Sequence, residues 1–202
     1  VLVVAFTTVV TMCMVDGITK KSVAAMLGTI IGVVFSGAFA LIFGQVTSIT
    51  GYNVSDIENL VYVGEMTDIK IGELLFAGIL IASLGAVMDV GMSIASTLNE
   101  LKEQNPQMML KELFQSGMNV GRDMMGTMTN TLILAFTGGS INTLVFIFAY
   151  NYEYQQVINM YSVGIEIMQG LSSSLGVIMA VPVTSWICLL YTSPSPRDIS
   201  GY

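Results

Sequence analysis

The sequence predicts an all-α protein, a polytopic bundle of transmembrane helices. Of its 202 residues, 53% are hydrophobic and only 10% are charged, whereas a soluble domain carries about 25% charged residues. The mean hydropathy is +0.75. So few charges cannot cover a water-facing surface. The long apolar runs also lack the strict alternation of apolar and polar residues that a membrane β-barrel shows.

About five apolar stretches approach the roughly 20 residues that a helix needs to cross a bilayer. They are 1–15, 22–47, 74–96, 124–150 and 165–187. As helices they satisfy their own backbone hydrogen bonds, which the hydrocarbon demands. The first stretch begins at Val1 without an initiator Met, so we interpret it as a truncated span and the chain as a fragment.

The C-terminal residues 188–202 break sharply in character from the helix before them. The run from Cys188 to Asp198 resembles the conceptual translation of a sequencing-library adapter, and a native Ser/Pro-rich tail is the alternative. We therefore expect a membrane domain over 1–187, followed by an adapter-derived, non-native tail.

The loops between the stretches predict an orientation. Two segments, 16–21 and 97–123, lie on the same side if every stretch crosses the membrane. The opposite side has Lys70 as its only basic residue. The basic residues of these two segments are Lys20, Lys21, Lys102, Lys111 and Arg122. The positive-inside rule therefore predicts that both segments are cytoplasmic. Within them, 101–118 is expected as an amphipathic helix on the membrane surface, and 56–63 as a short interfacial helix on the other side.

Asp89 is the strongest functional candidate. An ionisable side chain inside a bilayer costs free energy, so its presence indicates a function. Together with Gly85, Ser93 and Ser96 it forms one narrow polar stripe at i, i+4, i+8 and i+11. It would lie about 22 Å from the outer end of its helix at 1.5 Å per residue. This depth is nearer to the cytoplasmic face.

The stretch 124–150 has a polar stripe of its own. Its members are Asp123, Thr127, Asn130, Thr131 and Asn142. Arg122 precedes the stripe and can reach Asp89 if the two helices are neighbours. Two interpretations stay open: a polar site that holds a coupling ion or a substrate group, and a structural ion pair that locks two helices.

Two further features lie in the last two stretches. Glu166, with Gln169 and Ser173, repeats the polar pattern close to the outer interface. It is either part of a pathway or a side chain that reaches outward to water. Gly138 and Gly139 interrupt their stretch in its middle. A break near the midplane is a recurrent device of transporters, and a kink that serves packing is the alternative.

Composition excludes several function classes. A net charge of −7 offers no basic surface for nucleic acid. There is no His, and Cys13 and Cys188 are far apart, so no zinc or iron–sulfur spacing exists. Two methionine pairs at i, i+4 spacing suit Cu(I) but have no Cys or His beside them within a span. The sequence has no Walker-type loop, which excludes ATP hydrolysis by that route. No second Asp lies at the depth of Asp89, as an intramembrane aspartyl protease would need. We therefore expect no metal, no cofactor and no enzyme activity.

Residues 75–101 and 117–139 resemble the two signature stretches of the YibE/F-like family, and residues 16–48 are similar to it as well. The resemblance implies a multi-pass protein of the bacterial cytoplasmic membrane, often found as a pair of related membrane proteins. A paralogous membrane subunit is thus an implied partner, besides the lipid bilayer. As an activity it implies at most a permease, and it brings no catalytic motif.

Two functions follow as hypotheses. In the first, the chain is a secondary transporter or permease for an unknown small solute or ion. Its pathway residues are Asp89, Ser93, Arg122, Asp123, Asn130, Thr131 and Glu166, with a helix break at Gly138 and Gly139. Asp89 then carries the coupling ion or proton. In the second, the chain is a scaffold or partner subunit that transports nothing, and its polar stripes are contacts between helices.

Overall fold

The computed structural model describes residues 2–47 and 71–192, and every regular element in these ranges is a helix. The helices are α1 (Leu2–Asp16), α2 (Lys20–Thr47), α4 (Ile71–Gln104), α5 (Leu110–Gly139), α6 (Ile141–Ala149), α7 (Tyr154–Ile158) and α8 (Tyr161–Thr192). The predicted all-α fold class is confirmed.

Three of these helices are long and apolar enough to span a membrane: Lys20–Thr47, Phe76–Gln104 and Tyr161–Tyr191. A fourth span exists if α5 and α6, which meet at a bend of 54°, are taken together. The sequence suggested about five spans. The described part of the chain has fewer because α1 is apolar but only 15 residues long, short of the roughly 20 that a crossing needs.

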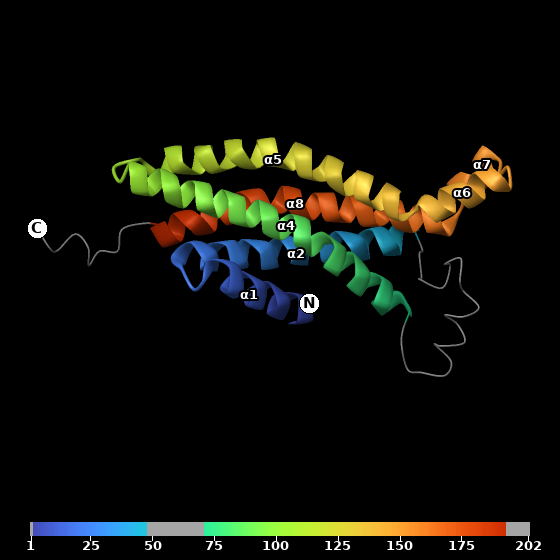
Figure 1. The fold of residues 1–202 in the computed structure, drawn as a ribbon, viewed down its shortest axis with the longest axis horizontal. Coiled ribbons are helices and arrows are strands. Elements are labelled where there is room, and N and C mark those ends of the chain that lie inside the picture. Colours follow the sequence, from blue (N-terminus) through green and yellow to red (C-terminus); the bar gives the residue numbers. More distant parts are fainter. Residues whose placement is uncertain (1, 48–70, 193–202) are drawn as a thin grey trace, which may run out of the picture.

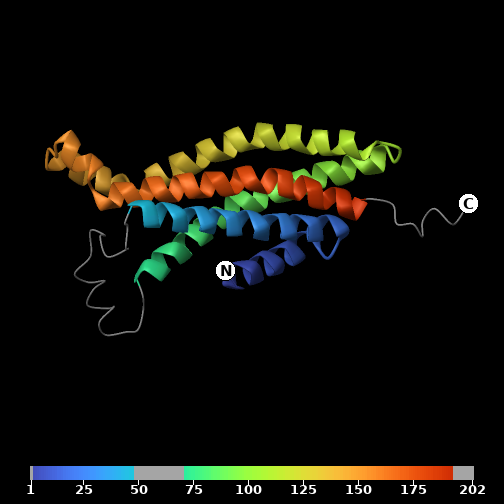
Figure 2. The ribbon, with the colours of Figure 1, turned by 180° about the vertical axis from the view of Figure 1, so that it is seen from behind.

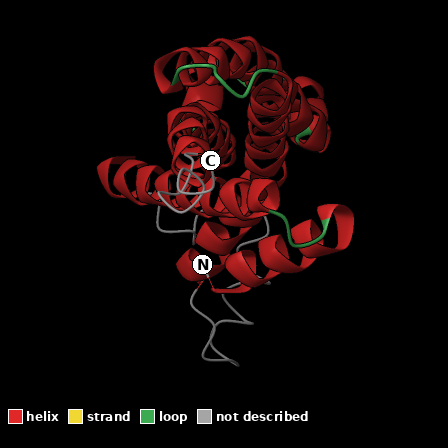
Figure 3. Cartoon of the chain, turned by 90° about the vertical axis from the view of Figure 1, so that its left-hand side faces the viewer, coloured by secondary structure: helices red, strands yellow, loops and turns green. Residues whose placement is uncertain are grey.

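The long helices run side by side and alternate in direction (Figures 1 and 2). α2, α4 and α8 each pack on the other two, α1 lies against α2, and α5 lies against α4 and α8. The end-on view shows the resulting bundle (Figure 3). The turns between α1 and α2 and between α4 and α5 share one end, and α6, α7 and the start of α8 lie at the other (Figure 1). α1 and α2, and likewise α4 and α5, are thus antiparallel neighbours joined by short turns.

The two ends of the bundle differ in composition. The end with the two turns, called the basic end below, carries Lys20, Lys21, Lys102 and Lys111. The opposite end, called the aromatic end, carries Tyr150, Tyr152, Tyr154 and Tyr161. The segments 16–21 and 97–123 of the sequence analysis therefore have their turns at the same end of the bundle.

Small residues at intervals of four bring α2 and α8 close together. The facing pairs are Gly28 with Thr184, Gly32 with Ala180, and Ser36 with Gly176. A Cβ atom on Gly32 would lie 2.9 Å from the Cβ of Ala180 and 3.3 Å from the carbonyl oxygen of Gly176. Such spacing is typical of helices that pack within lipid, where close backbone approach replaces the hydrophobic effect.

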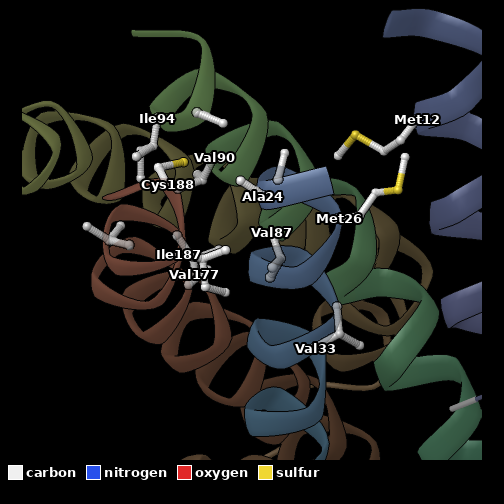
Figure 4. Close-up of a cluster of buried hydrophobic side chains, with 14 of the residues drawn as sticks. Met12, Ala24, Met26, Val33, Val87, Val90, Ile94, Val177, Ile187 and Cys188 are labelled. Atoms are coloured by element: carbon white, nitrogen blue, oxygen red, sulfur yellow. The ribbon is translucent and has the colours of Figure 1, made fainter. Parts of the chain in front are cut away.

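Apolar side chains of α1, α2, α4 and α8 fill the space around this contact (Figure 4). Cys188 is one of them: its side chain is buried and lies beside Val90 and Ile94 of α4. α8 does not stop at Ile187 but continues to Thr192. The boundary expected at residue 188 thus falls inside a continuous helix.

The expected surface helix over 101–118 is wrong. α4 continues to Gln104 and α5 begins at Leu110, so a turn divides this segment between two long helices. A Cβ on Gly117 would lie 2.7 Å from Oγ of Ser185 and 3.0 Å from Cδ1 of Leu98. The glycine lets α5 approach closely, so protein covers Leu113 and Gly117, while Met109 stays exposed. The helix expected over 56–63 lies outside the described residues.

Candidate functional site

In the described part of the chain, the interior of the bundle contains polar groups but no charged ones. Among the described side chains, the buried polar residues are Thr8, Ser22, Thr29, Ser36, Ser83, Ser172, Ser173, Ser174, Thr184 and Ser185. All of them are hydroxyl residues. A charged pathway through the centre of α2, α4 and α8 is therefore not present in the described part of the chain.

Some of these hydroxyls gather at the contact of the three central helices. Oγ1 of Thr29 and Oγ1 of Thr184 lie 3.0 and 3.6 Å from the position of a Cβ on Gly91 of α4. Neither hydroxyl has a hydrogen-bond partner, although both are buried. Sequence reasoning missed this cluster. The signal that could have found it is the small-residue spacing of α2 and α8, which predicts that they touch.

Asp89 lies on the exposed side of α4. Its neighbours Val87, Val90 and Gly91 face the interior, whereas Asp89 is exposed and Ser93 is half-buried. Within residues 2–47 and 71–192, no ion pair of Asp89 with Arg122 is found. The structure therefore does not bring these two candidates together as a salt bridge, although both helices belong to the same bundle.

The polar stripe of α5 faces outward. Arg122, Asp123, Asn130 and Thr131 are exposed, while the buried positions of α5 are Leu113, Gly117, Gly121 and Leu132. The threonines satisfy their hydroxyls within the helix, since Oγ1 of Thr131 donates to the carbonyl oxygen of Thr127 at 2.9 Å. Asn130 forms no hydrogen bond with the described residues. α5 thus presents polar groups at a place where lipid offers them no partner.

Contacts with α8 fix how deep this polar stripe reaches. A Cβ on Gly121 would meet the side chain of Val181, and a Cβ on Gly170 would lie 3.6 Å from Cδ2 of Phe136. Asn130 lies between these two contacts, beside the central turns of α8. The stripe therefore extends into the middle of the bundle rather than ending near the basic end.

The helix break lies at the aromatic end of the bundle. α5 ends at Gly139 and α6 begins at Ile141, and Ser140 between them donates its backbone N–H to the carbonyl oxygen of Phe136 at 3.0 Å. Nothing lies within 4 Å of a Cβ built on Gly138 or Gly139, so close packing does not require these glycines. The break was expected near the midplane. It lies at the end because α5 begins at Leu110, well before the apolar stretch.

A groove of about 430 Å³ opens beside this break, between α5 and α6 on one side and α8 on the other. Most of its lining is apolar, with Phe136, Leu144 and Ile167 among its members. Hydroxyl residues are interspersed among them: Thr129, Thr137, Ser140, Thr143, Ser162 and Ser174. The bend creates the groove, because α6 diverges from the first turns of α8.

Among the described residues that line this groove, Glu166 is the one ionisable residue. Its side chain is half-buried, and no hydrogen bond or ion pair joins it to another described residue. Sequence reasoning found Glu166 and the glycines but did not place them together. The hydroxyls of Thr137, Ser140 and Thr143 were missed, although their spacing of three puts them on one helical face.

A model of the family described as YibE/F-like protein matches residues 1–194. The chain belongs to the YibE/F-like family. The match covers the resembling stretches 75–101 and 117–139, which form most of α4 and α5, and it extends past Ile187 to include Cys188. No curated protein and no solved structure matches this YibE/F-like protein.

Proposed function

We propose that this YibE/F-like protein is part of a membrane permease whose path runs along the outward polar face of α5. One observation carries the proposal: α5 exposes Arg122, Asp123 and Asn130, whereas all four of its buried positions are apolar. Polar groups at membrane depth are tolerated where protein covers them or where they line a water-filled cavity. In the proposal a further membrane element closes the path, and a paralogous subunit is one such element.

The candidates have separate roles in this proposal. Asn130, Thr131 and Asp123 line the path, and Glu166 lies at its opening at the aromatic end. Asp89 carries the coupling ion or proton, without Arg122 as its partner, since the two side chains form no ion pair among the described residues. The proposal assigns no catalysis to the chain, and it locates the protein in a bacterial cytoplasmic membrane.

A second candidate is a scaffold subunit that transports nothing. The tightly packed, uncharged contact of α2, α4 and α8 favours it, because such a centre holds helices together and offers no route. In this case a partner helix covers the polar face of α5, and Asn130 donates a hydrogen bond across that contact.

Thiol accessibility separates the two candidates. With Cys13 and Cys188 replaced by alanine, we expect Asn130→Cys to react with a water-soluble methanethiosulfonate reagent in membranes. The matched control is Ile178→Cys, which is exposed on α8 and lies between the contacts at Gly170 and Val181. We expect it to face lipid, so it should stay unreactive. If Asn130→Cys is as protected as Ile178→Cys, the path does not exist and the scaffold function stands.

A further inference from the structure

We infer that the groove between α5–α6 and α8 binds an amphiphile with a cationic head and an apolar chain, which enters from the lipid. The head lies at Glu166 and the chain lies along the apolar lining toward Ser174 in this groove of about 430 Å³. The inference holds whether or not the chain transports anything, because it concerns occupancy of the groove alone.

Charge is the first step of the argument. Glu166 is the single ionisable group in the groove, and the described chain supplies it with no cation. Lys20, Lys21, Lys102 and Lys111 all lie at the opposite, basic end of the bundle. A carboxylate in apolar surroundings favours a positive partner and disfavours an anion. The groove therefore discriminates between amphiphiles by the sign of their head group.

Depth is the second step. Tyr161 and Trp186 on α8 are 52% and 62% exposed, and they lie 25 positions apart, or about 37 Å at 1.5 Å per residue. Exposed Tyr and Trp gather at the two interfaces of a bilayer, whose total thickness with head groups is about 40–45 Å. Glu166 follows Tyr161 by five positions, so it lies near the level where head groups meet acyl chains.

The shape of the groove is the third step. It follows α8 from Ser162 to Ser174, about 18 Å at 1.5 Å per residue, so it leads from the head-group level into the hydrocarbon. Its polar members at the Glu166 level, Ser140 and Thr143 among them, are hydroxyls that can accept hydrogen bonds from an ammonium group. Toward Ser174 the lining offers apolar contacts for a chain, such as those of Ile133 and Leu171.

The aromatic residues beside the groove support this placement. Phe146 and Tyr150 stack with their ring centres 6.2 Å apart, and Tyr152 lies 6.1 Å from Tyr150. Phe146 follows the lining residue Leu144 on α6, Tyr150 and Tyr152 lie directly after that helix, and all three rings are exposed. Aromatic faces attract ammonium groups, so the approach to the groove also favours a cation.

Spin-labelled probes test the inference in the full chain, reconstituted in nanodiscs of zwitterionic lipid. The two probes are an alkylammonium and a fatty acid of the same chain length, each with a nitroxide on the chain. We expect the protein to immobilise the ammonium probe several-fold more than the carboxylate probe. Glu166→Gln should abolish this preference, and Glu166→Asp should keep most of it. Equal immobilisation of both probes by the unmodified protein overturns the inference.

Two further variants make the test specific. Glu153→Gln removes a carboxylate at the same end of the bundle that does not line the groove, and it should leave the preference unchanged. Gly170→Met extends a side chain toward Phe136 and fills the groove, so it should lower the immobilised fraction of the ammonium probe. A preference that survives Glu166→Gln, or that disappears equally in Glu153→Gln, assigns the effect to surface charge and overturns the inference.

Discussion

Glycines on the same helix differ in what they do. On α5, a Cβ on Gly121 would meet the branched side chain of Val181, whereas a Cβ on Gly126 would find nothing within 4 Å. Val181 is fully buried, and a β-branched side chain has little rotameric freedom with which to yield. Gly121 therefore sets how closely α5 approaches α8, while Gly126 only lowers the helix propensity of α5.

This difference gives a prediction for a matched pair of substitutions. Gly121→Ala should lower the free energy of unfolding by about 1–3 kcal/mol, because overpacking displaces α5 from α8. Gly126→Ala should leave it unchanged or raise it by up to about 1 kcal/mol, through helix propensity. Denaturant unfolding in bicelles measures both values. Adding Val181→Ala should relieve part of the Gly121→Ala defect, and equal stabilities of the two single variants would contradict the assignment.

Single residues also mark what the sequence could predict. Asp89, Arg122 and Glu166 are visible because a charge stands out in an apolar run. Their surroundings are not visible, because these depend on the rotation of each helix about its axis. That rotation is decided by the close contacts of residues such as Gly91 and Gly117. Glu166 was thus predicted as a candidate site residue, but the hydroxyl groups that α5 and α6 bring beside it were not.

At the scale of elements, α5 and α6 show where apolar length misleads. Hydropathy makes 124–150 one apolar stretch, because it does not register a bend; only the glycine pair Gly138 and Gly139 indicated a break in it. In the structure, α6 leaves α5 at 54° beyond the last contacts of α5 with α8. All its large side chains except Ile147 are exposed. An apolar helix that is uncovered at the end of a bundle fits the interfacial layer of a bilayer.

We predict that α6 lies at head-group depth and does not continue into the hydrocarbon. Nitroxide labels at Leu134→Cys on α5 and Phe148→Cys on α6, both exposed positions, report depth by their collisions with oxygen and with a nickel chelate. Leu134 should appear deep, with frequent oxygen collisions. Phe148 should appear shallow, with frequent nickel collisions. Equal depths would mean that α5 and α6 cross the bilayer as one bent span.

At the scale of the whole molecule, the described lysines and most of the described tyrosines lie at opposite ends. Four lysines lie at the basic end, and four of the described tyrosines lie at the aromatic end. The sequence predicted from the loops alone that the basic residues gather on one side, because antiparallel helices of similar length bring alternate loops to the same end. The positive-inside rule predicts that the basic end faces the cytoplasm.

Labelling of single cysteines in whole cells checks this orientation. In a background without Cys13 and Cys188, Asn151→Cys in the turn between α6 and α7 should react with an impermeant maleimide in intact cells. Asn105→Cys in the turn between α4 and α5 should react only after permeabilisation. Reactivity of Asn105→Cys in intact cells would reverse the orientation, and with it the side from which the Glu166 groove is reached.

The four-residue spacing shared by α2 and α8 has a mechanical consequence. Sliding α8 by one turn, about 6 Å at 1.5 Å per residue, would place Thr184 against Gly32 and Ala180 against Ser36, again small against small. Sterics between these two helices alone therefore permit several registers of similar quality. Contacts with α4 favour one of these registers, because the side chain of Val87 packs against Gly32. The side chains of Thr29 and Thr184 pack against Gly91 of the same helix. Contacts with α4 therefore stop α8 from shifting along α2 into another register.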